Sequence, residues 1–181
     1  SRFVDELPKL GVIEEIKGAK KVLNQPVKHP RNPLLVRDKP WELSGPYYGT
    51  VLFDEHEALF KMWYENWEQS EGTDGSLLLY ATSTNGIDWE KPVVDKEGGT
   101  SFVRHPPVPG FQAAGIFRDP VETDPAKRYK MLFSCAPDGT SGTLMTSAAH
   151  SHDGVHWTAY PDLPLIPFSD TQNCPFWDAQ R

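Results

Sequence analysis

A carboxylate beside an apolar segment is the first feature of this sequence that could do chemistry. Asp119 follows the segment Gly115–Phe117 and precedes Pro120. An ionisable group beside apolar residues is costly unless it is paired or used, so this position predicts either a catalytic carboxylate or a simple turn before the proline. Its neighbour Arg118 either binds a substrate carboxylate or pairs with Asp119 or Glu122.

The composition limits the partners and cofactors of the protein. The chain of 181 residues has a formal net charge of −7, which argues against nucleic acid or an anionic membrane because both bind clustered Lys and Arg. No apolar run approaches the roughly 20 residues of a membrane helix. Cys135 and Cys174 lack metal-site spacing, so no metal site is predicted, and they form either a disulfide or two free thiols. The 17 prolines, 14 glycines and 12% aromatic residues predict many short strands joined by turns.

An internal repeat organises the chain. The segment Lys-Met-Trp-Tyr that begins at Lys61 returns at Lys130 as Lys-Met-Leu-Phe. A turn of the form Ser-x-Asn/Asp-Gly begins at Ser83 and again at Ser151, and each copy is followed by a tryptophan. The spacing between copies is nearly the same at these separate landmarks, which indicates two copies of one structural unit.

Each copy is interpreted as four antiparallel strands, which is the blade of a β-propeller. In the first copy these strands are residues 51–53, 59–64, 77–83 and a short strand around Trp89. A duplicated β-sandwich is the alternative. Residues that recur with the repeat are assigned to structure rather than to chemistry: Trp63, Trp89 and Trp157 to the core, and Asp54, Asp124 and Asp178 to hairpin turns.

The repeat also predicts the domain organisation. Residues 1–45 form an N-terminal arm, 46–112 a first blade, 113–168 a second blade, and 169–181 the start of a third. Because two and a half blades cannot close a ring, the chain is expected to be a fragment or to be completed by a second chain or segment. We expect the proline-rich arm to lie across the propeller and help to fasten it.

Two phrases of the sequence resemble a known group of enzymes. Residues 80–92, Tyr-Ala-Thr-Ser-Thr-Asn-Gly-Ile-Asp-Trp-Glu-Lys-Pro, and residues 117–120, Phe-Arg-Asp-Pro, are similar to the five-bladed propeller glycoside hydrolases. These include the fructosidases and the arabinanase and xylosidase group. The similarity spans about residues 25–181 and is closest to uncharacterised bacterial members, which share the Lys-Met-Trp-Tyr strand and an Asp-Thr-Gln-Asn segment. The turn after Ser83 also resembles the Asp-box of sialidases, but is one residue short of it.

The resemblance implies a site in the funnel that the innermost strands surround. Enzymes of this group use two carboxyl groups to cleave a glycosidic bond. Asp119 matches the Asp of the fructosidase Arg-Asp-Pro motif, which binds sugar hydroxyls and stabilises the transition state. Glu42 stands where the family has an Asn-Asp-Pro-Asn nucleophile segment that this sequence lacks, and the family's general acid belongs to a later blade. Asp170 and Asn173 are expected to face the same funnel, with Asn173 and Gly49 as the neighbours of Asp119 on the other blades.

Substrate-binding residues are predicted around these carboxylates. Each candidate has a structural alternative: Glu42 pairs with a lysine, Asp170 and Asn173 cap a loop, and His105 belongs to an ordinary loop. The aromatic candidates would stack on a sugar ring. The predicted substrate-binding residues are Arg118, Asn173, Trp41, Tyr47 and His105, and Tyr48 is a further stacking candidate.

The sequence therefore predicts an all-β, five-bladed propeller of the glycosidase type, acting on glycosidic bonds of oligo- or polysaccharides. A non-catalytic carbohydrate-binding or structural propeller is the alternative, and a protein-interaction propeller is a third option. No cofactor is expected. A structural calcium ion would agree with some relatives, although no Asp/Glu cluster has calcium-loop spacing. A secreted or periplasmic location is favoured.

Overall fold

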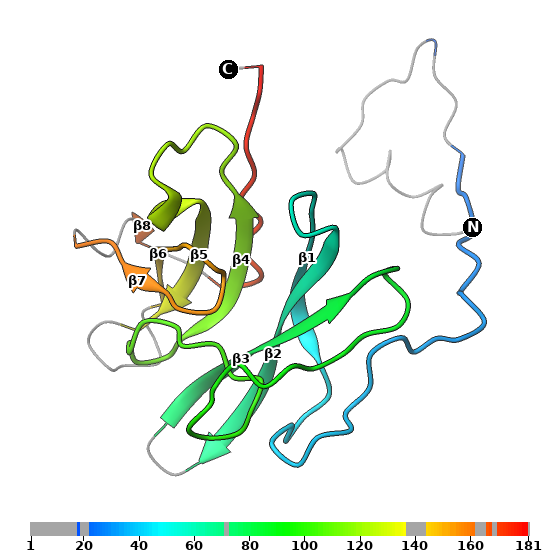
Figure 1. The fold of residues 1–181 in the computed structure, drawn as a ribbon, viewed down its shortest axis with the longest axis horizontal. Helices are drawn as coiled ribbons and strands as arrows, with labels where there is room; N and C mark the ends of the chain where they lie inside the picture. The colour runs from blue at the N-terminus through cyan, green and yellow to red at the C-terminus, as the bar shows by residue number, and fades with distance from the viewer. Residues whose placement is uncertain are drawn as a thin grey trace, which may run out of the picture. The chain divides into compact units, whose positions relative to one another are not determined.

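The computed structural model describes residue 18 and residues 22–70, 73–136, 144–161, 166–167 and 170–180. The chain divides into two compact units, Ser1–Asn32 and Pro33–Arg181, and the second unit contains the strands discussed below. These strands form two antiparallel sheets (Figure 1). Within the described ranges there is no α-helix, and so no helix that is long and apolar enough to cross a membrane.

The first sheet has the order β1-β2-β3, with β1 at Tyr47–Asp54, β2 at Leu59–Ser70 and β3 at Thr73–Ser83. The β1–β2 hairpin is tight because Asp54 Oδ1 accepts the backbone N–H groups of residues 56 and 57, at 3.0 and 3.3 Å. This is the side-chain-to-backbone turn expected of aspartate.

The outer edge of β3 is paired in pieces rather than by one strand. Thr82 and Glu90 exchange two backbone hydrogen bonds of 2.8 Å, and the edge resumes where Tyr80 donates to Ser101. The predicted fourth strand around Trp89 is therefore a single bridge. A loop that begins with Lys91 and a proline leaves the sheet between the two contacts, because proline cannot donate to the ladder.

The second sheet repeats this plan with the order β4-β5-β6-β7, and β8 also pairs with β6. His150 of β6 pairs with Thr158, as Thr82 pairs with Glu90 in the first sheet. The bounds are β4 Gln112–Arg118, the short 3₁₀ turn η2 Pro125–Lys127, β5 Tyr129–Cys135, β6 Met145–Ser151, β7 Thr158–Ala159 and β8 Ile166–Pro167.

The repeated Ser-x-Asn/Asp-Gly turns have the same hydrogen bonds in both sheets. Ser83 Oγ accepts from the backbone N–H groups two and three residues later, at 3.3 and 2.9 Å, and Ser151 Oγ does so at 3.2 and 2.9 Å. Trp89 and Trp157 each donate from the indole nitrogen to the glycine carbonyl of their turn, at 3.2 and 3.0 Å. The motif recurs because this network fixes the end of each third strand.

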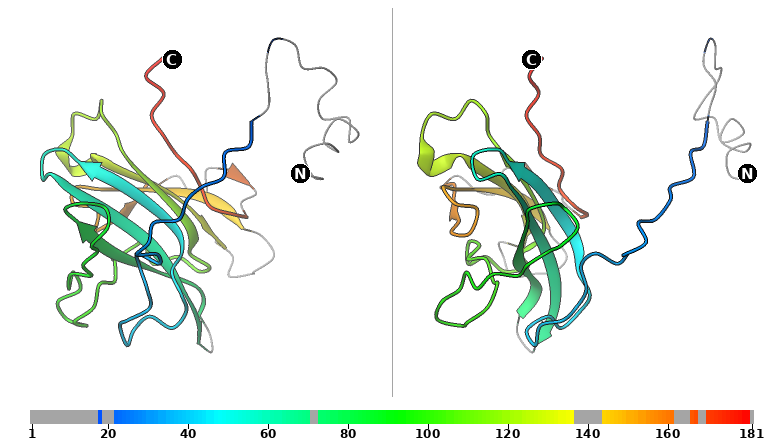
Figure 2. Two further views of the ribbon diagram at one scale, coloured as in Figure 1. Left: turned by 90° about the vertical axis from the view of Figure 1, so that its right-hand side faces the viewer. Right: turned by 45° about the vertical axis from the view of Figure 1, so that its right-hand side comes forward.

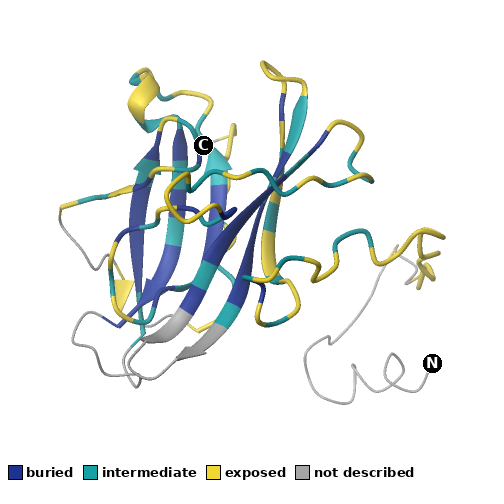
Figure 3. Cartoon of the chain, turned by 60° about the horizontal axis from the view of Figure 1, so that its bottom comes forward, coloured by how far each residue is buried: buried dark blue, intermediate teal, exposed yellow. Residues whose placement is uncertain are grey.

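The main core lies between the two sheets, which pack face to face (Figure 2). Trp63 of β2 is 1% exposed and donates to the Gly154 carbonyl at 2.6 Å, so it joins the first sheet to the turn of the second. Figure 3 shows the buried residues along the strands of both sheets. Members of this core include Trp63, Leu78, Tyr80, Ala114, Ile116, Tyr129, Met131, Phe133, Ala149 and Trp157.

The opposite face of the first sheet is covered by residues 33–45. Leu35 and Trp41 pack against a second apolar cluster whose buried members are Tyr64, Leu79 and Ala81. Alternation along β2 explains this arrangement, since Trp63 faces the second sheet and Tyr64 therefore faces the other way. The arm that was expected to fasten the propeller thus contacts this face from Pro33 onward, while residues before it belong to the other unit.

Candidate functional site

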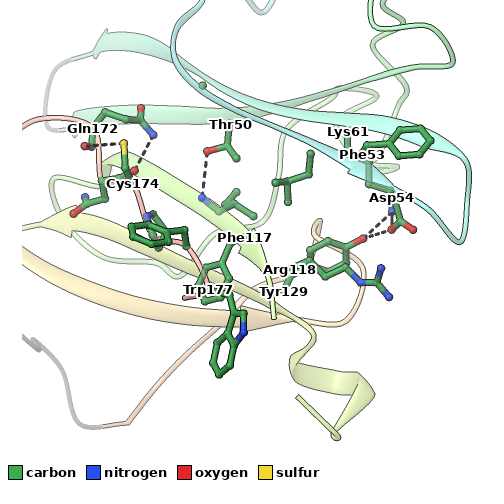
Figure 4. Close-up of a pocket in the computed structure, with 16 residues that line it drawn as sticks. Thr50, Phe53, Asp54, Lys61, Phe117, Arg118, Tyr129, Gln172, Cys174 and Trp177 are labelled. Atoms are coloured by element: carbon green, nitrogen blue, oxygen red, sulfur yellow. Dashed lines mark hydrogen bonds and ion pairs between the residues drawn. The ribbon is translucent and has the colours of Figure 1, made fainter. Parts of the chain in front are cut away.

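A hollow of about 400 Å³ lies between the innermost strands β1 and β4 and the segment 172–177 (Figure 4). The segment 172–177 lies against β4, and β4 in turn contacts β1. Thr50 of β1 ties the two innermost strands together, because its hydroxyl accepts the Ile116 N–H at 3.2 Å. We call this hollow the inner-strand pocket.

Aromatic and polar side chains share the walls of the inner-strand pocket. Phe53 of β1 is 50% exposed, with its ring centroid 4.8 Å from that of Phe60, and Trp177 is 44% exposed. Arg118, at the end of β4, lines the same space. Apolar rings with a few convergent polar groups are the usual composition of a small-molecule site.

Both innermost strands begin with a distorted residue. Tyr48 has a φ of 30° and Ala113 a φ of 58°, a left-handed conformation that non-glycine residues rarely adopt. Each lies where the strand pairing shifts register, as in a β-bulge. Such strain is commonly held at functional sites. Gly115 then allows the segment 172–177 to approach, because a Cβ there would clash with the Asn173 carbonyl.

A buried carboxyl group of β2 contacts the bulged start of β4. Glu65 of β2 is 0% exposed, and its Oε1 accepts the Ala114 N–H at 2.5 Å. Its Oε2 has no hydrogen-bond partner within the described part of the chain. Burial raises the pKa of Glu65 above the ordinary value, which favours the neutral form. Tyr47 lies beside it with its hydroxyl bonded to Ser76, and burial raises the pKa of Tyr47 to about 12.

Two amide side chains hold the segment 172–177 on β4. The backbone N–H and the Nδ2 of Asn173 both donate to the Ala113 carbonyl, at 3.1 and 2.8 Å. Gln172 Nε2 donates to the Ala114 carbonyl at 2.6 Å. The bulged start of β4 is therefore satisfied by these side chains rather than by β5 alone, and Asn173 lines the inner-strand pocket while it fixes that wall.

An ion pair of the first sheet, at the other end of the pocket, is bonded to a tyrosine of the second sheet. Lys61 Nζ lies 3.2 Å from Asp54 Oδ2, and Tyr129 of β5 donates to the same carboxylate at 2.5 Å. Burial opposes ionisation of Asp54, but the hydrogen bonds from Tyr129 and Lys61 hold its pKa well below the ordinary range. Burial alone would lower the pKa of Lys61, yet its bonds to Glu57 and Tyr129 raise it. The pair is thus charged and fully engaged.

Asp119 lies at the end of β4 and does not line the inner-strand pocket. Its Oδ1 accepts the Val121 N–H at 3.1 Å and its Oδ2 is 3.9 Å from Lys130. The strand pairing also places Asp119 level with Asp54, and not with Gly49 and Asn173 as the sequence had suggested.

Glu42 is 0% exposed and makes the contacts of a structural ion pair. Lys91 Nζ lies 2.7 and 2.8 Å from its two oxygens, and Tyr64 donates to Oε1 at 2.8 Å. Oε2 also accepts two backbone N–H groups, of Asp38 and Lys39, at 3.0 Å. Burial would raise the pKa of Glu42, but these partners lower it. Glu42 faces away from the second sheet, so the structure does not bring it together with Asp119.

The remaining predicted residues lie in three places. Asp170 is exposed, two residues before the pocket wall, with no hydrogen bond or ion pair to the described residues. Trp41 packs on the first sheet and donates to Ser101 Oγ at 3.3 Å. His105 stacks on Phe111 with ring centroids 3.8 Å apart, and burial lowers its pKa. Neither Trp41 nor His105 lines the inner-strand pocket.

The structure also contains functional candidates that the sequence analysis did not select. The sequence places Phe53 in the first strand of the repeat and assigns no role to Trp177 or Glu65. The signal for Glu65 was alternation, which places it on the same face of β2 as Trp63. No group of three His, Cys, Asp or Glu side chains that could hold a metal occurs in the described residues. The two cysteines are free thiols, one buried and one exposed.

Comparison with known proteins identifies the fold. No protein-family model and no curated protein matches the sequence. Among solved structures, BT0996 in an RGII complex is 22% identical, with a TM-score of 0.53 over 74% of this protein and 38% of that one. An N-acetylgalactosamine deacetylase from F. plautii, in complex with blood group B trisaccharide, is 17% identical, with a TM-score of 0.50 over 67% of this protein and 31% of that one.

A fructofuranosidase from Schwanniomyces occidentalis, complexed with fructosylnystose, is 14% identical, with a TM-score of 0.49 over 70% of this protein and 25% of that one. The chain has the all-β fold of five-bladed propeller glycoside hydrolases, as the sequence predicted, and it holds a few of the blades. It spans 25% to 40% of the length of the solved proteins to which it is similar. At these identities the similarity establishes the fold alone.

Proposed function

We propose that this protein is a carbohydrate-active propeller that binds an oligosaccharide in the inner-strand pocket and acts on its glycosidic bonds. The observation that supports this most directly is the presence of two half-exposed aromatic rings, Phe53 and Trp177, with the polar groups of Arg118 and Asn173 in one hollow. Sugar rings offer apolar C–H faces and a rim of hydroxyls, which match such a surface. The deacetylase of similar fold was solved with a trisaccharide bound.

Cleavage would require two carboxyl groups near the bond. Of the carboxylates predicted from sequence, Asp170 is exposed two residues before the pocket wall and makes no hydrogen bond or ion pair with a described residue, so we propose it as the one that acts on the substrate. Asp119 lies 3.9 Å from Lys130, and the buried Glu42 forms an ion pair of 2.7 Å with Lys91.

A second candidate function is binding without cleavage. It is favoured by the contacts of Asp54, the carboxylate that lines the inner-strand pocket, because both of its oxygens are engaged by the hairpin, Lys61 and Tyr129. In this case Asp170 would only add a polar contact at the rim.

Binding and cleavage should be measured separately on the same protein. Calorimetric titration with a panel of oligosaccharides would report binding, and mass spectrometry of the products would distinguish loss of a sugar residue from loss of an acetyl group. We expect Trp177→Ala to weaken binding about 10-fold or more, because ring contacts are worth about 0.5–1.5 kcal/mol beyond the buried area. Val93→Ala, at a 54% exposed apolar residue outside the pocket, is the control.

The outcomes separate the two candidate functions. Products that disappear in Asp170→Asn, while binding is retained, support the enzyme. Binding without any product supports the carbohydrate-binding alternative. Failure to bind any saccharide on the panel, with the protein folded, overturns both.

A further inference from the structure

Arg118 is the uncommitted cation of the inner-strand pocket. Its guanidinium lines the pocket and makes no hydrogen bond or ion pair with any described residue. The other basic group in the wall, Lys61, is 3% exposed and bonded to Asp54, Glu57 and Tyr129. A guanidinium is always charged, and it presents a planar fork of donors that suits a carboxylate.

The acidic residues that follow Arg118 in sequence do not neutralise it. Lys130 Nζ lies 2.5 Å from Glu122 and 3.9 Å from Asp119, so both carboxylates are directed to a different cation. The pairing alternative raised by the sequence is therefore not used. Lys130 lowers the pKa of Glu122 to about 2, which keeps that acid charged and engaged.

The two copies of the repeat have different residues at the position of Arg118. Leu52 pairs with Lys61 in the first sheet and Phe117 pairs with Lys130 in the second, so Phe53 and Arg118 occupy equivalent positions on β1 and β4. Figure 4 draws Phe53 and Arg118 among the side chains that line the pocket, together with Trp177 at the end of the segment 172–177. The two innermost strands thus present an aromatic ring and a cation at the same level.

We propose that the ligand of the inner-strand pocket is an acidic glycan, in which a uronic acid carboxylate binds Arg118 while neighbouring rings stack on Phe53 and Trp177. This inference rests on the proposed function and names its substrate class. The protein has a formal net charge of −7 and would repel an anion in general, so a polyanionic ligand requires a specific cation. Arg118 supplies that cation within a pocket whose other charges are paired.

The test is a titration with trigalacturonic acid and with its methyl ester, which share one backbone and differ in charge. We expect the protein to bind the acid at least about 10-fold more tightly than the ester, with the preference weakening as salt is added. Arg118→Gln should weaken binding of the acid about 10- to 100-fold and leave the ester unchanged. Arg118→Lys should restore part of the affinity, because it keeps the charge but loses the fork.

A matched control and the remaining outcomes complete the test. Arg37→Gln removes the same charge from an exposed residue outside the pocket and should change neither titration. Equal affinity for acid and ester, or a preference for a sulfated oligosaccharide over the uronate, overturns the carboxylate assignment and leaves the proposed function standing. Failure to bind any saccharide, charged or neutral, overturns the proposed function and this inference with it.

Discussion

The two sheets repeat one aspartate–lysine pair at equivalent positions, and the two copies differ in burial. In the first sheet Asp54 and Lys61 are 3.2 Å apart, with side chains 4% and 3% exposed. In the second sheet Asp119 and Lys130 are 3.9 Å apart and 16% and 17% exposed. The difference arises because Tyr129 of the second sheet packs over the first pair and donates to Asp54. The pair that the neighbouring sheet buries is thus the shorter one, and Tyr129 bonds it to the second sheet.

The comparison also bears on chemistry. A residue that recurs at the same register with the same partner is best explained by its structural role, and Asp119 recurs as the counterpart of Asp54. The positions where the sheets differ are better guides to function. Arg118 replaces Phe53, and Ser134 replaces Glu65, so the pocket cation and the buried acid are each unique to one sheet.

Removing the lysine from each pair should give the largest difference in stability between the two sheets. Lys61→Met leaves the Asp54 carboxylate buried without its cation, and we expect the free energy of unfolding to fall by about 3–5 kcal/mol. Lys130→Met should cause a clearly smaller loss, because its carboxylates remain in contact with water. Urea unfolding followed by tryptophan fluorescence measures both. Equal losses would mean that the packing of Tyr129 does not set the strength of the pair.

The repeat was visible in the sequence, but its register was only partly so. Similar segments at Lys61 and Lys130, and at Ser83 and Ser151, located both sheets. This was possible because strands and turns depend on local sequence patterns. Equating Asp54 with Asp124 was wrong. Val51 pairs with Met62 in the first sheet, and Ile116 pairs with Met131 in the second. Counting three residues along each strand makes Asp119 the counterpart of Asp54. The longer β4–β5 connection, in which Asp124 caps η2, absorbs the difference.

The candidate site was less predictable than the fold. Arg118 and Asn173 were selected from the family resemblance, and both line the inner-strand pocket. The sequence left open whether Glu42 acts on a substrate or pairs with a lysine. The structure shows the pair, and its partner Lys91 could not be identified from sequence because it is distant in the chain. Alternation alone places Glu65 on the core face of β2, but its contact with Ala114 could not be predicted because it depends on how the two sheets pack.

The buried acid that distinguishes the first sheet should give the stability a pH dependence. The pKa of Glu65 is raised, so the folded state holds this proton more tightly than the unfolded chain. Its contribution is therefore fully present below the ordinary Glu pKa and is lost as the pH rises toward the raised value. Glu65→Gln keeps an acceptor for the Ala114 N–H and cannot ionise. We expect the variant to gain stability relative to the wild type as the pH rises.

Urea unfolding of both proteins from about pH 4 to pH 9 measures this difference. Glu55→Gln, at an exposed hairpin residue, is the control and should run parallel to the wild type. If Glu65→Gln also runs parallel across this range, Glu65 does not titrate between folded and unfolded states, and the buried carboxyl plays no part in the pH response.

The repeated turns should show the smallest effect and the least difference between the sheets. Ser83 and Ser151 are 3% and 2% exposed, and each hydroxyl accepts two backbone hydrogen bonds of matching length. We therefore expect Ser83→Ala and Ser151→Ala to lower the free energy of unfolding by the same amount, about 1–2 kcal/mol. Thr84→Ala, at an exposed position of the first turn, is the control. The turn after Ser151 also accepts a hydrogen bond from Trp63 of the first sheet, at the Gly154 carbonyl. A much larger loss for Ser151→Ala than for Ser83→Ala would show that this turn stabilises the contact between the sheets as well as its own sheet.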